Sequence, residues 1–457
     1  MPTRRGVPIH PVQTPGGGPG GGPYCGPVSG TWRFARLLSA PHRLGFFSAA
    51  LMLALSALWW ALSLVAREAG WPLPWAVPPA VAHGLLMTLG FMPLFIVGFL
   101  FTAGPRWLGL PEVSASSLRK PVLAMLGGWV VALAGFHAHE LLAGLGLAAV
   151  AGGWTALVLR FFGLWRQSRV PDKLHAAAIT VAGAVAALAL WGATLALAVG
   201  WPTGARIATQ VALWGAMAPT FAVVSHRMIP FFTASALPRL DAWRPNWLLW
   251  VMLVVLAAGC AGAVAELLWW PLPPVLRWAQ VAVEAPAALL MGCLAVRWGL
   301  VQSLKIRLLA MLHAGFVWLG IALALSALSH GLMALGGGGL GLAPTHALAM
   351  GYLGATLIAM ITRVAAGRRR PGLGAVLGRS DRRGAARDRS AVACGQPAVA
   401  AAGGRRLGRC HHRLGLALRQ LARPAAQRRP SRLRPGSAQN LARLQENRHG
   451  PVARRLR

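Results

Sequence analysis

Long, uncharged apolar runs recur through most of this 457-residue chain and leave it few ways to fold. Each run approaches the roughly 20 residues that a helix needs to cross the hydrocarbon core of a bilayer. Most runs lack the polar face that a soluble amphipathic helix shows at its helical period. Charged residues make up only 12% of the chain, against 56% hydrophobic ones. The sequence therefore predicts an all-α, polytopic transmembrane helix bundle.

Ten spans can be distinguished, separated by segments in which Pro, Trp and Gly are frequent. A Gly/Pro-rich lead, residues 1–40, precedes them; it holds too little apolar surface to bury a core and lacks the short apolar segment of a signal peptide. The spans form a predicted transmembrane domain over residues 41–367. They are expected near residues 44–66, 81–103, 121–137, 141–162, 174–199, 207–225, 247–269, 274–296, 307–329 and 342–362.

Positive charge alternates from one connecting segment to the next. Lys and Arg are concentrated before the first span and after spans two, four, six and eight, whereas the intervening segments hold at most one each. Positively charged loops stay on the cytoplasmic side of a membrane. The pattern therefore predicts a cytoplasmic N-terminus, with the loops after the odd-numbered spans outside.

Histidines fall at unusual places in these spans. Seven of the ten before Gly367 stand at or just inside the ends of apolar runs. An imidazole at membrane depth is costly without a partner, so these positions favour metal or haem ligation, or proton transfer. One more histidine is expected about two turns inside span nine, and His330, beside Gly331, is expected in a loop. Loop charge assigns His83, His137, His139, His330 and His346 to the outer side and His175 and His226 to the inner side, with His313 within the bilayer.

Two outer histidines are each followed by a methionine at the fourth position. His83 precedes Met87, and His346 precedes Met350. Residues four apart share one face of a helix. Imidazole with thioether suits copper(I), and imidazole alone suits haem iron. The two helices could share one metal, or the methionines could only fill space while the histidines bind interfacial water.

His139 is a third candidate metal ligand on the outer side, in the segment His-Ala-His-Glu. Histidines two apart point to different faces of a helix, so they cannot readily bind one ion unless the helix ends there. An interfacial turn is the alternative interpretation of this segment. The five cysteines form no C-x-x-C-H motif, so any haem is expected to be non-covalent.

The inner histidines suggest a haem site. His175 opens span five and His226 closes span six, so the two rings could ligate haem b from opposite sides. A propionate of that haem could then meet Arg227, Arg239 or Arg363. His313 is a further candidate ligand, because water is scarce at its depth and an unsatisfied imidazole is poorly tolerated there. Alternatively, the first two histidines are ordinary loop residues that reach the cytoplasmic surface.

Three segments together resemble one family, over roughly residues 40–367. They are HGLLMTLGFMPLFIVGFLFTAGPRWLGLP from His83, SHRMIPFFT from Ser225 and HALAMGYLGATLIAMITRVAAG from His346. In this order and spacing they resemble the NnrS family. Arg363 stands in that family's M-x-T-R block, which adds to its candidacy for contacting a propionate or another anion.

The resemblance implies a twelve-span protein of the bacterial inner membrane that contains haem b and copper and acts in the response to nitric oxide and nitrosative stress. The partners it implies are the lipid bilayer and nitric oxide or a related small molecule, without nucleic acid. It leaves open whether the protein is an enzyme.

Two other classes of function remain. One is a transporter or permease without cofactors. The other is a divergent subunit of a haem–copper oxidase or nitric oxide reductase, which would be expected to show adjacent histidines in a middle helix and His-x-His in span ten. His346 stands alone in span ten, and neither span six nor span seven contains an adjacent pair.

The residues after Gly367 differ from the rest of the chain. Residues 368–457 hold 23 Arg, no Lys and three acidic residues, with strong Ala, Gly, Pro and Leu bias. This composition is typical of a GC-rich gene translated out of frame. We interpret the tail as disordered or frameshifted, with the last two family spans missing; a genuine basic tail is the alternative.

Overall fold

The described part of the chain is helical. The computed structural model describes residues 37–237 and 239–366, and no strand occurs in these ranges. Ten helical runs are long and apolar enough to cross a membrane, and each overlaps one predicted span. The predicted fold class, an all-α polytopic bundle, is therefore confirmed. The Arg-rich tail lies outside the described residues, as does the lead up to residue 36.

Seven spans are single α-helices, and three combine α-helix with a π-helical segment. The first group is α1 (Pro41–Glu68), α4 (Ser116–Ala138), α5 (Glu140–Gln167), α6 (Leu174–Ala198), α9 (Asn246–Leu268), α10 (Pro274–Arg297) and α12 (Arg307–Ala334). Span two joins α2 (Pro79–Leu85), η2 (Leu86–Gly90) and α3 (Met92–Trp107). Span six joins α7 (Pro202–Ala212), η3 (Leu213–Met217) and α8 (Ala218–Ala236). Span ten joins α13 (Ala343–His346), η4 (Ala347–Gly354) and α14 (Ala355–Ala366), and the short α11 (Leu300–Ser303) precedes span nine.

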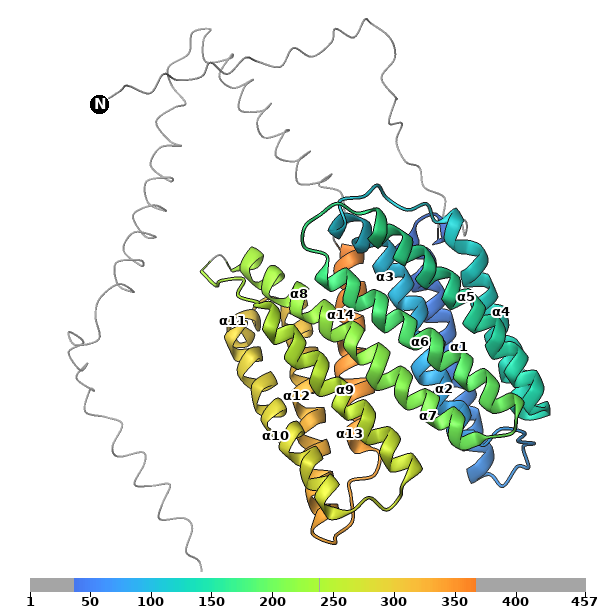
Figure 1. Ribbon diagram of the computed structural model, residues 1–457. Helices are drawn as coiled ribbons and strands as arrows, with labels where there is room; N and C mark the ends of the chain where they lie inside the picture. The colour runs from blue at the N-terminus through green and yellow to red at the C-terminus, as the bar shows by residue number, and fades with distance from the viewer. Residues whose placement is uncertain (1–36, 238, 367–457) are drawn as a thin grey trace, which may run out of the picture. The chain divides into compact units, whose positions relative to one another are not determined.

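Successive spans run in opposite directions, because each connection is short and the next span begins at the end where the previous span finishes. We call the end at which α1 begins the first end and the opposite one the second end; they lie toward the top and bottom of Figure 1. The first end holds the starts of α4, α6, α9 and α12. The second end holds the starts of α2, α5, α7, α10 and α13.

Two local predictions are wrong. Span six does not close at His226 but continues through Pro230 to Ala236. Proline is tolerated inside membrane helices, where neighbouring groups satisfy the backbone that it frees. His330 lies not in a loop but in α12, which continues past Gly331 to Ala334.

Spans two and six form the interior of the bundle. Of their apolar stretches, 89% and 72% respectively are buried, against 22% for α9 and 28% for α10. Large apolar side chains cover the outer surfaces of the less enclosed helices, as expected where lipid is the solvent. Residues on spans two and six are therefore the best placed to form an enclosed site.

The α4–α5 pair is held by close backbone contact. A Cβ added to Gly128 of α4 would lie 2.6 Å from the carbonyl oxygen of Gly146 on α5, which is too close for any other side chain. Small residues let membrane helices approach in this way. The two helices meet at His139, whose extended backbone ends α4 and begins α5.

Candidate functional site

The three segments that carry the family resemblance meet in space. The guanidinium of Arg227, in the second segment, lies 4.9 Å from the ring centre of Trp107 in the first. The hydroxyl of Ser225, also in the second, lies 3.1 Å from that of Tyr352 in the third. These contacts join spans two, six and ten, and both hydroxyl-bearing residues are buried.

Each of these three spans contains a π-helical segment. In span ten it begins directly after His346, and in span two it begins three residues after His83. In span six it precedes the second family segment. π-Helical turns are rare and occur most often at functional sites, because they re-aim side chains. The feature therefore marks the central spans as the candidate site.

His175 and His226 form a buried pair toward the first end. Nε2 of His175 lies 3.1 Å from Nδ1 of His226, whose Nε2 lies 3.2 Å from the carbonyl oxygen of Pro245. A carbonyl only accepts, so His226 donates from Nε2 and accepts at Nδ1. His175 must then donate from Nε2 and keep its lone pair on Nδ1. This atom is buried and has no hydrogen-bond partner.

This geometry limits how the pair could bind haem. The rings stack with their centres 5.3 Å apart and an interplanar angle of 28°. An iron atom between two axial imidazoles would hold the ligating nitrogens roughly 4 Å apart, twice a metal–nitrogen distance of about 2.0 Å. As arranged, the rings leave no space for a haem between them. The free Nδ1 of His175 is the ligating atom that the pair offers.

His313 is a second buried ring toward the first end. Its Nε2 lies 3.1 Å from the hydroxyl of Thr233 in the second family segment, and its buried Nδ1 has no partner. A cavity of about 280 Å³ lies beside α12, with Leu312 and Arg363 among its lining residues. The Arg363 guanidinium lies 4.5 Å from the ring centre of Phe232. Arg363 thus borders a cavity at the same end of the bundle as His313, although His313 does not itself line that cavity.

His83 and His346 lie at the second end. The ring of His83 stacks on Trp60, with centres 4.1 Å apart, and its Nδ1 is buried without a partner. His346 lies near enough to His83 for the two to interact electrostatically. Nδ1 of His346 donates to the carbonyl oxygen of Leu342 at 2.9 Å, which leaves the Nε2 lone pair free. Metal-ligating histidines commonly donate to a backbone carbonyl in this way.

The two methionines proposed beside these histidines differ in placement. Met87 is half-buried against the hydrophobic core. Met350 is 71% exposed and therefore faces away from the bundle interior. The structure thus keeps Met87 packed against the core, on the same span as His83, and leaves Met350 outside the bundle interior.

The histidines at the α4–α5 junction have structural partners. His137 donates from Nδ1 to the carbonyl oxygen of Pro74 and accepts at Nε2 from the indole of Trp59, at 2.8 and 2.9 Å. Both ring nitrogens are therefore satisfied. His139 is exposed and accepts from the backbone N–H of Leu141 at 3.1 Å, which caps α5. A helix does end at this segment, as the binding of one ion by both histidines would require, but His139 serves there as the N-cap of α5.

No group of three or more His, Cys, Asp or Glu side chains suited to hold a metal ion occurs among the residues that the structure describes. The chain instead presents single imidazoles. His83, His175 and His313 are alike in offering a buried, unpartnered Nδ1. One imidazole per metal suits a haem iron, since the macrocycle supplies the other four nitrogens.

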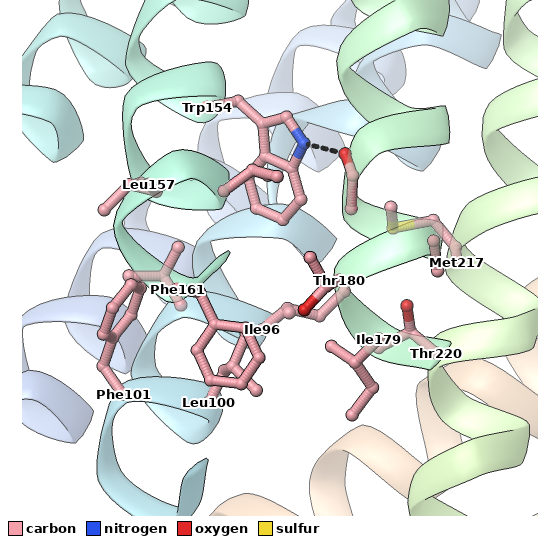
Figure 2. Close-up of a pocket in the computed structure, with 14 residues that line it drawn as sticks. Ile96, Leu100, Phe101, Trp154, Leu157, Phe161, Ile179, Thr180, Met217 and Thr220 are labelled. Atoms are coloured by element: carbon pink, nitrogen blue, oxygen red, sulfur yellow. Dashed lines mark hydrogen bonds between the residues drawn. The ribbon is translucent and has the colours of Figure 1, made fainter. Parts of the chain in front are cut away.

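A small apolar cavity lies in the middle of the bundle, between α3, α5, α6 and span six (Figure 2). Trp154 borders it and donates to the carbonyl oxygen of Gly183 at 2.9 Å. None of the candidate histidines lines it. Its lining of aliphatic and aromatic side chains suits a small apolar molecule and excludes an ionic one.

Sequence reasoning missed several residues of the site. Thr233, Ser225 and Tyr352 all stand within the family segments, but an isolated hydroxyl gives no signal of its partner. Trp60 could not be paired with His83, because their contact depends on how α1 and α2 pack. Pro245 was also missed, since its role rests on a backbone carbonyl.

A known family model matches the region that contains these three segments. The family model described as "NnrS protein" matches residues 36–376 of the chain. Neither the curated proteins nor the solved structures include a match to it. The matched region contains every span of the bundle and every candidate residue above.

Proposed function

The chain belongs to the NnrS family, and we propose that it is a haem- and copper-binding protein of the bacterial inner membrane that acts in the response to nitric oxide or nitrosative stress. Its N-terminus is assigned to the cytoplasm, so the first end of the bundle faces the cytoplasm. The alternation of positive charge between connecting segments supports this orientation.

One observation carries the proposal. Three histidines of the apolar spans, His83, His175 and His313, each keep a buried Nδ1 without a hydrogen-bond partner. An unsatisfied polar atom in the hydrocarbon interior of a membrane costs on the order of several kcal/mol. A ligand bound at these nitrogens would remove that cost. Their donor chemistry fits haem iron and copper, which accept imidazole nitrogen.

The candidate ligands divide between the two ends. At the first end, His175 and His313 are proposed to hold haem b, with Arg363 on a propionate. At the second end, His83 and His346 are proposed to hold copper or a second haem, with Met87 as an added thioether. Haem iron would supply a reversible binding site for nitric oxide, and copper a second redox centre.

The central cavity supports a small apolar ligand. Nitric oxide is diatomic and uncharged, so it partitions into apolar space. The cavity beside Trp154 offers such space within the helices that also carry His175. We therefore propose that this cavity can hold nitric oxide inside the bundle.

The test is cofactor analysis of the purified full-length protein. We expect a haem b band in the reduced-minus-oxidised spectrum, bound copper by metal analysis, and a spectral shift on adding nitric oxide. His175→Leu and His313→Leu should each lose at least half of the haem. His137→Gln is the matched control, because both of its ring nitrogens already have protein partners.

Three results would overturn parts of the proposal. A well-folded protein without haem or copper would favour a cofactor-free transporter. Haem whose spectrum does not change on adding nitric oxide would show that nitric oxide is not its ligand. Equal loss of haem in His137→Gln and His175→Leu would mean that haem loss reports general damage to the fold.

A further inference from the structure

Four ionisable side chains gather at the second end, which also holds His83 and His346. They come from three helices: Glu266 from α9, Arg277 and Glu284 from α10, and His330 from α12. Arg277 and Glu284 are buried, and the other two are partly buried. Ionisable groups within membrane spans are costly and usually have a functional role.

His330 stands between the two carboxylates. Its Nδ1 lies 2.7 Å from Oε2 of Glu284, and its Nε2 lies 3.4 Å from Oε1 of Glu266. An ionised carboxylate can only accept hydrogen bonds, so Nδ1 carries hydrogen when Glu284 is ionised, and a hydrogen on Nε2 would lie toward the carboxylate of Glu266. The geometry therefore accommodates an imidazolium held between two carboxylates.

Charge counting gives the same result. Arg277 lies 3.6 Å from Glu266 and supplies one positive charge against two negative ones. One proton on the histidine makes the cluster neutral, and its loss would leave a net negative charge in the bilayer region. The cluster therefore holds one proton that can sit on His330 or pass to Glu284 along the short hydrogen bond.

Arg277 is fixed in place by other contacts. Its Nε donates to the carbonyl oxygen of Leu272 at 3.2 Å, and its guanidinium lies 5.1 Å from the ring centre of Trp270. It therefore acts as a constant positive charge. His346, on the neighbouring α13, is exposed and bonded to its own helix, and no ion-pair contact joins it to the cluster among the described residues.

Exposure decreases in one direction through the cluster. The side chain of Glu266 is 26% exposed, that of His330 13% and that of Glu284 9%. Oε1 of Glu266 is buried, accepts no hydrogen bond and makes only ion-pair contacts of 3.4 and 3.6 Å. The cluster lies where α9 ends and α10 begins, beside a connecting segment. Water can therefore reach Glu266 first and Glu284 last.

We propose that Glu266, His330 and Glu284 form a proton-exchange site between the aqueous phase at the second end and the bundle interior. The relay starts with His330 neutral and protonated on Nδ1. A proton accepted at Glu266 passes to Nε2 of His330, so an O–H bond at Glu266 breaks, an N–H bond at Nε2 forms and the ring becomes an imidazolium. The Nδ1 proton then passes to Oε2 of Glu284, so an N–H bond at Nδ1 breaks and an O–H bond at Glu284 forms. The reverse steps release the proton, and no metal or haem takes part.

The experiment is an infrared pH titration of the full-length protein in lipid nanodiscs, followed by exchange into heavy water. The wild type should show a buried protonated-carboxyl band or an imidazolium band that changes with pH and exchanges. Glu284→Gln and His330→Gln should each lose this signal. Glu68→Gln, at the same end but on a side chain exposed to solvent, is the matched control and should keep it.

A variant that removes one positive and one negative charge together distinguishes loss of the proton route from misfolding. Removing one member of a buried ion pair leaves its partner uncompensated, whereas removing both is far better tolerated. Glu266→Gln combined with Arg277→Gln should fold, keep the signal of His330 and Glu284, and slow its exchange at least tenfold. A wild type with no titrating signal would overturn the proposal, as would unchanged signals in Glu284→Gln and His330→Gln. Exchange at the wild-type rate in the double variant would remove Glu266 from the route.

Discussion

Nε2 of His175 lies 3.1 Å from Nδ1 of His226, and the direction of this hydrogen bond follows from a third group. Pro245 supplies only a carbonyl to His226, so the donor order is fixed from His175 to His226 to Pro245. The pair therefore holds His175 in one orientation, with one free lone pair. This is how a neighbouring histidine can position a ligand without binding the metal itself.

His226→Leu should weaken both the fold and the haem site. The variant leaves the Nε2–H of His175 buried without an acceptor, which costs about 1–3 kcal/mol. Freed from its partner, the His175 ring can rotate, so haem content should fall by more than half. Stability is measured by denaturant titration in mixed micelles, and haem by absorbance per protein.

The control for this prediction is His137→Gln. It breaks hydrogen bonds to Trp59 and Pro74 at the second end, so it should lower stability without lowering haem content. If His226→Leu keeps its full haem content, the pair is structural and does not position a ligand.

Ser225 and Tyr352 should behave as a coupled pair. Their hydroxyls lie 3.1 Å apart in the buried centre of the bundle, and they join spans six and ten. Interhelical hydrogen bonds in membranes contribute about 0.6 kcal/mol on average and up to about 1.7. We expect Tyr352→Phe and Ser225→Ala each to destabilise the protein, and the double variant to cost less than their sum. Strict additivity in the double-mutant cycle would show that the two hydroxyls do not interact.

The sequence predicts the spans well, because span length and loop charge are local properties. The predictions are wrong where a residue type that often ends a helix in soluble proteins is tolerated inside a membrane helix. Span six is predicted to close at His226, yet α8 continues past Pro230 to Ala236, and His330 is predicted in a loop although α12 includes it. Hydrocarbon forces the backbone to stay hydrogen-bonded, so helices continue where a soluble protein would turn.

The candidate site is less predictable than the fold. The sequence identifies His175, His226 and His313 as candidates but gives no ring orientation. Which nitrogen stays free depends on Pro245 and Thr233, and these contacts form only when the helices pack. The sequence also places Glu266 and Glu284 in or near apolar spans, where they could relay protons or form hydrogen bonds between helices. Their pairing with His330 could not be predicted, because it depends on how three helices pack.

Arg363→Gln should lower haem content if this residue contacts a propionate. The guanidinium borders the cavity beside α12 and stacks on Phe232, so it is already oriented without a ligand. We expect haem affinity to fall roughly tenfold, the loss of about 1.4 kcal/mol for a charge-assisted hydrogen bond. Haem titration of the apoprotein measures this affinity. The control is Arg166→Gln, because Arg166 is an exposed arginine at the same end of the bundle that also lies over a phenylalanine ring, that of Phe162. Equal affinities in the two variants would remove Arg363 from the site.

Gly128 and Gly127 are adjacent on α4 and should respond oppositely to alanine. A Cβ at Gly128 would lie 2.6 Å from the carbonyl oxygen of Gly146 and 2.9 Å from the backbone nitrogen of Val150, so α4 and α5 would have to separate. Such overpacking costs about 1–3 kcal/mol. A Cβ at Gly127 meets no atom within 4 Å, so Gly127→Ala should leave stability unchanged or raise it by up to about 1 kcal/mol through helix propensity. Unfolding in mixed micelles compares the two variants directly. Equal stability in both would show that α4 and α5 do not pack as closely as their backbones indicate.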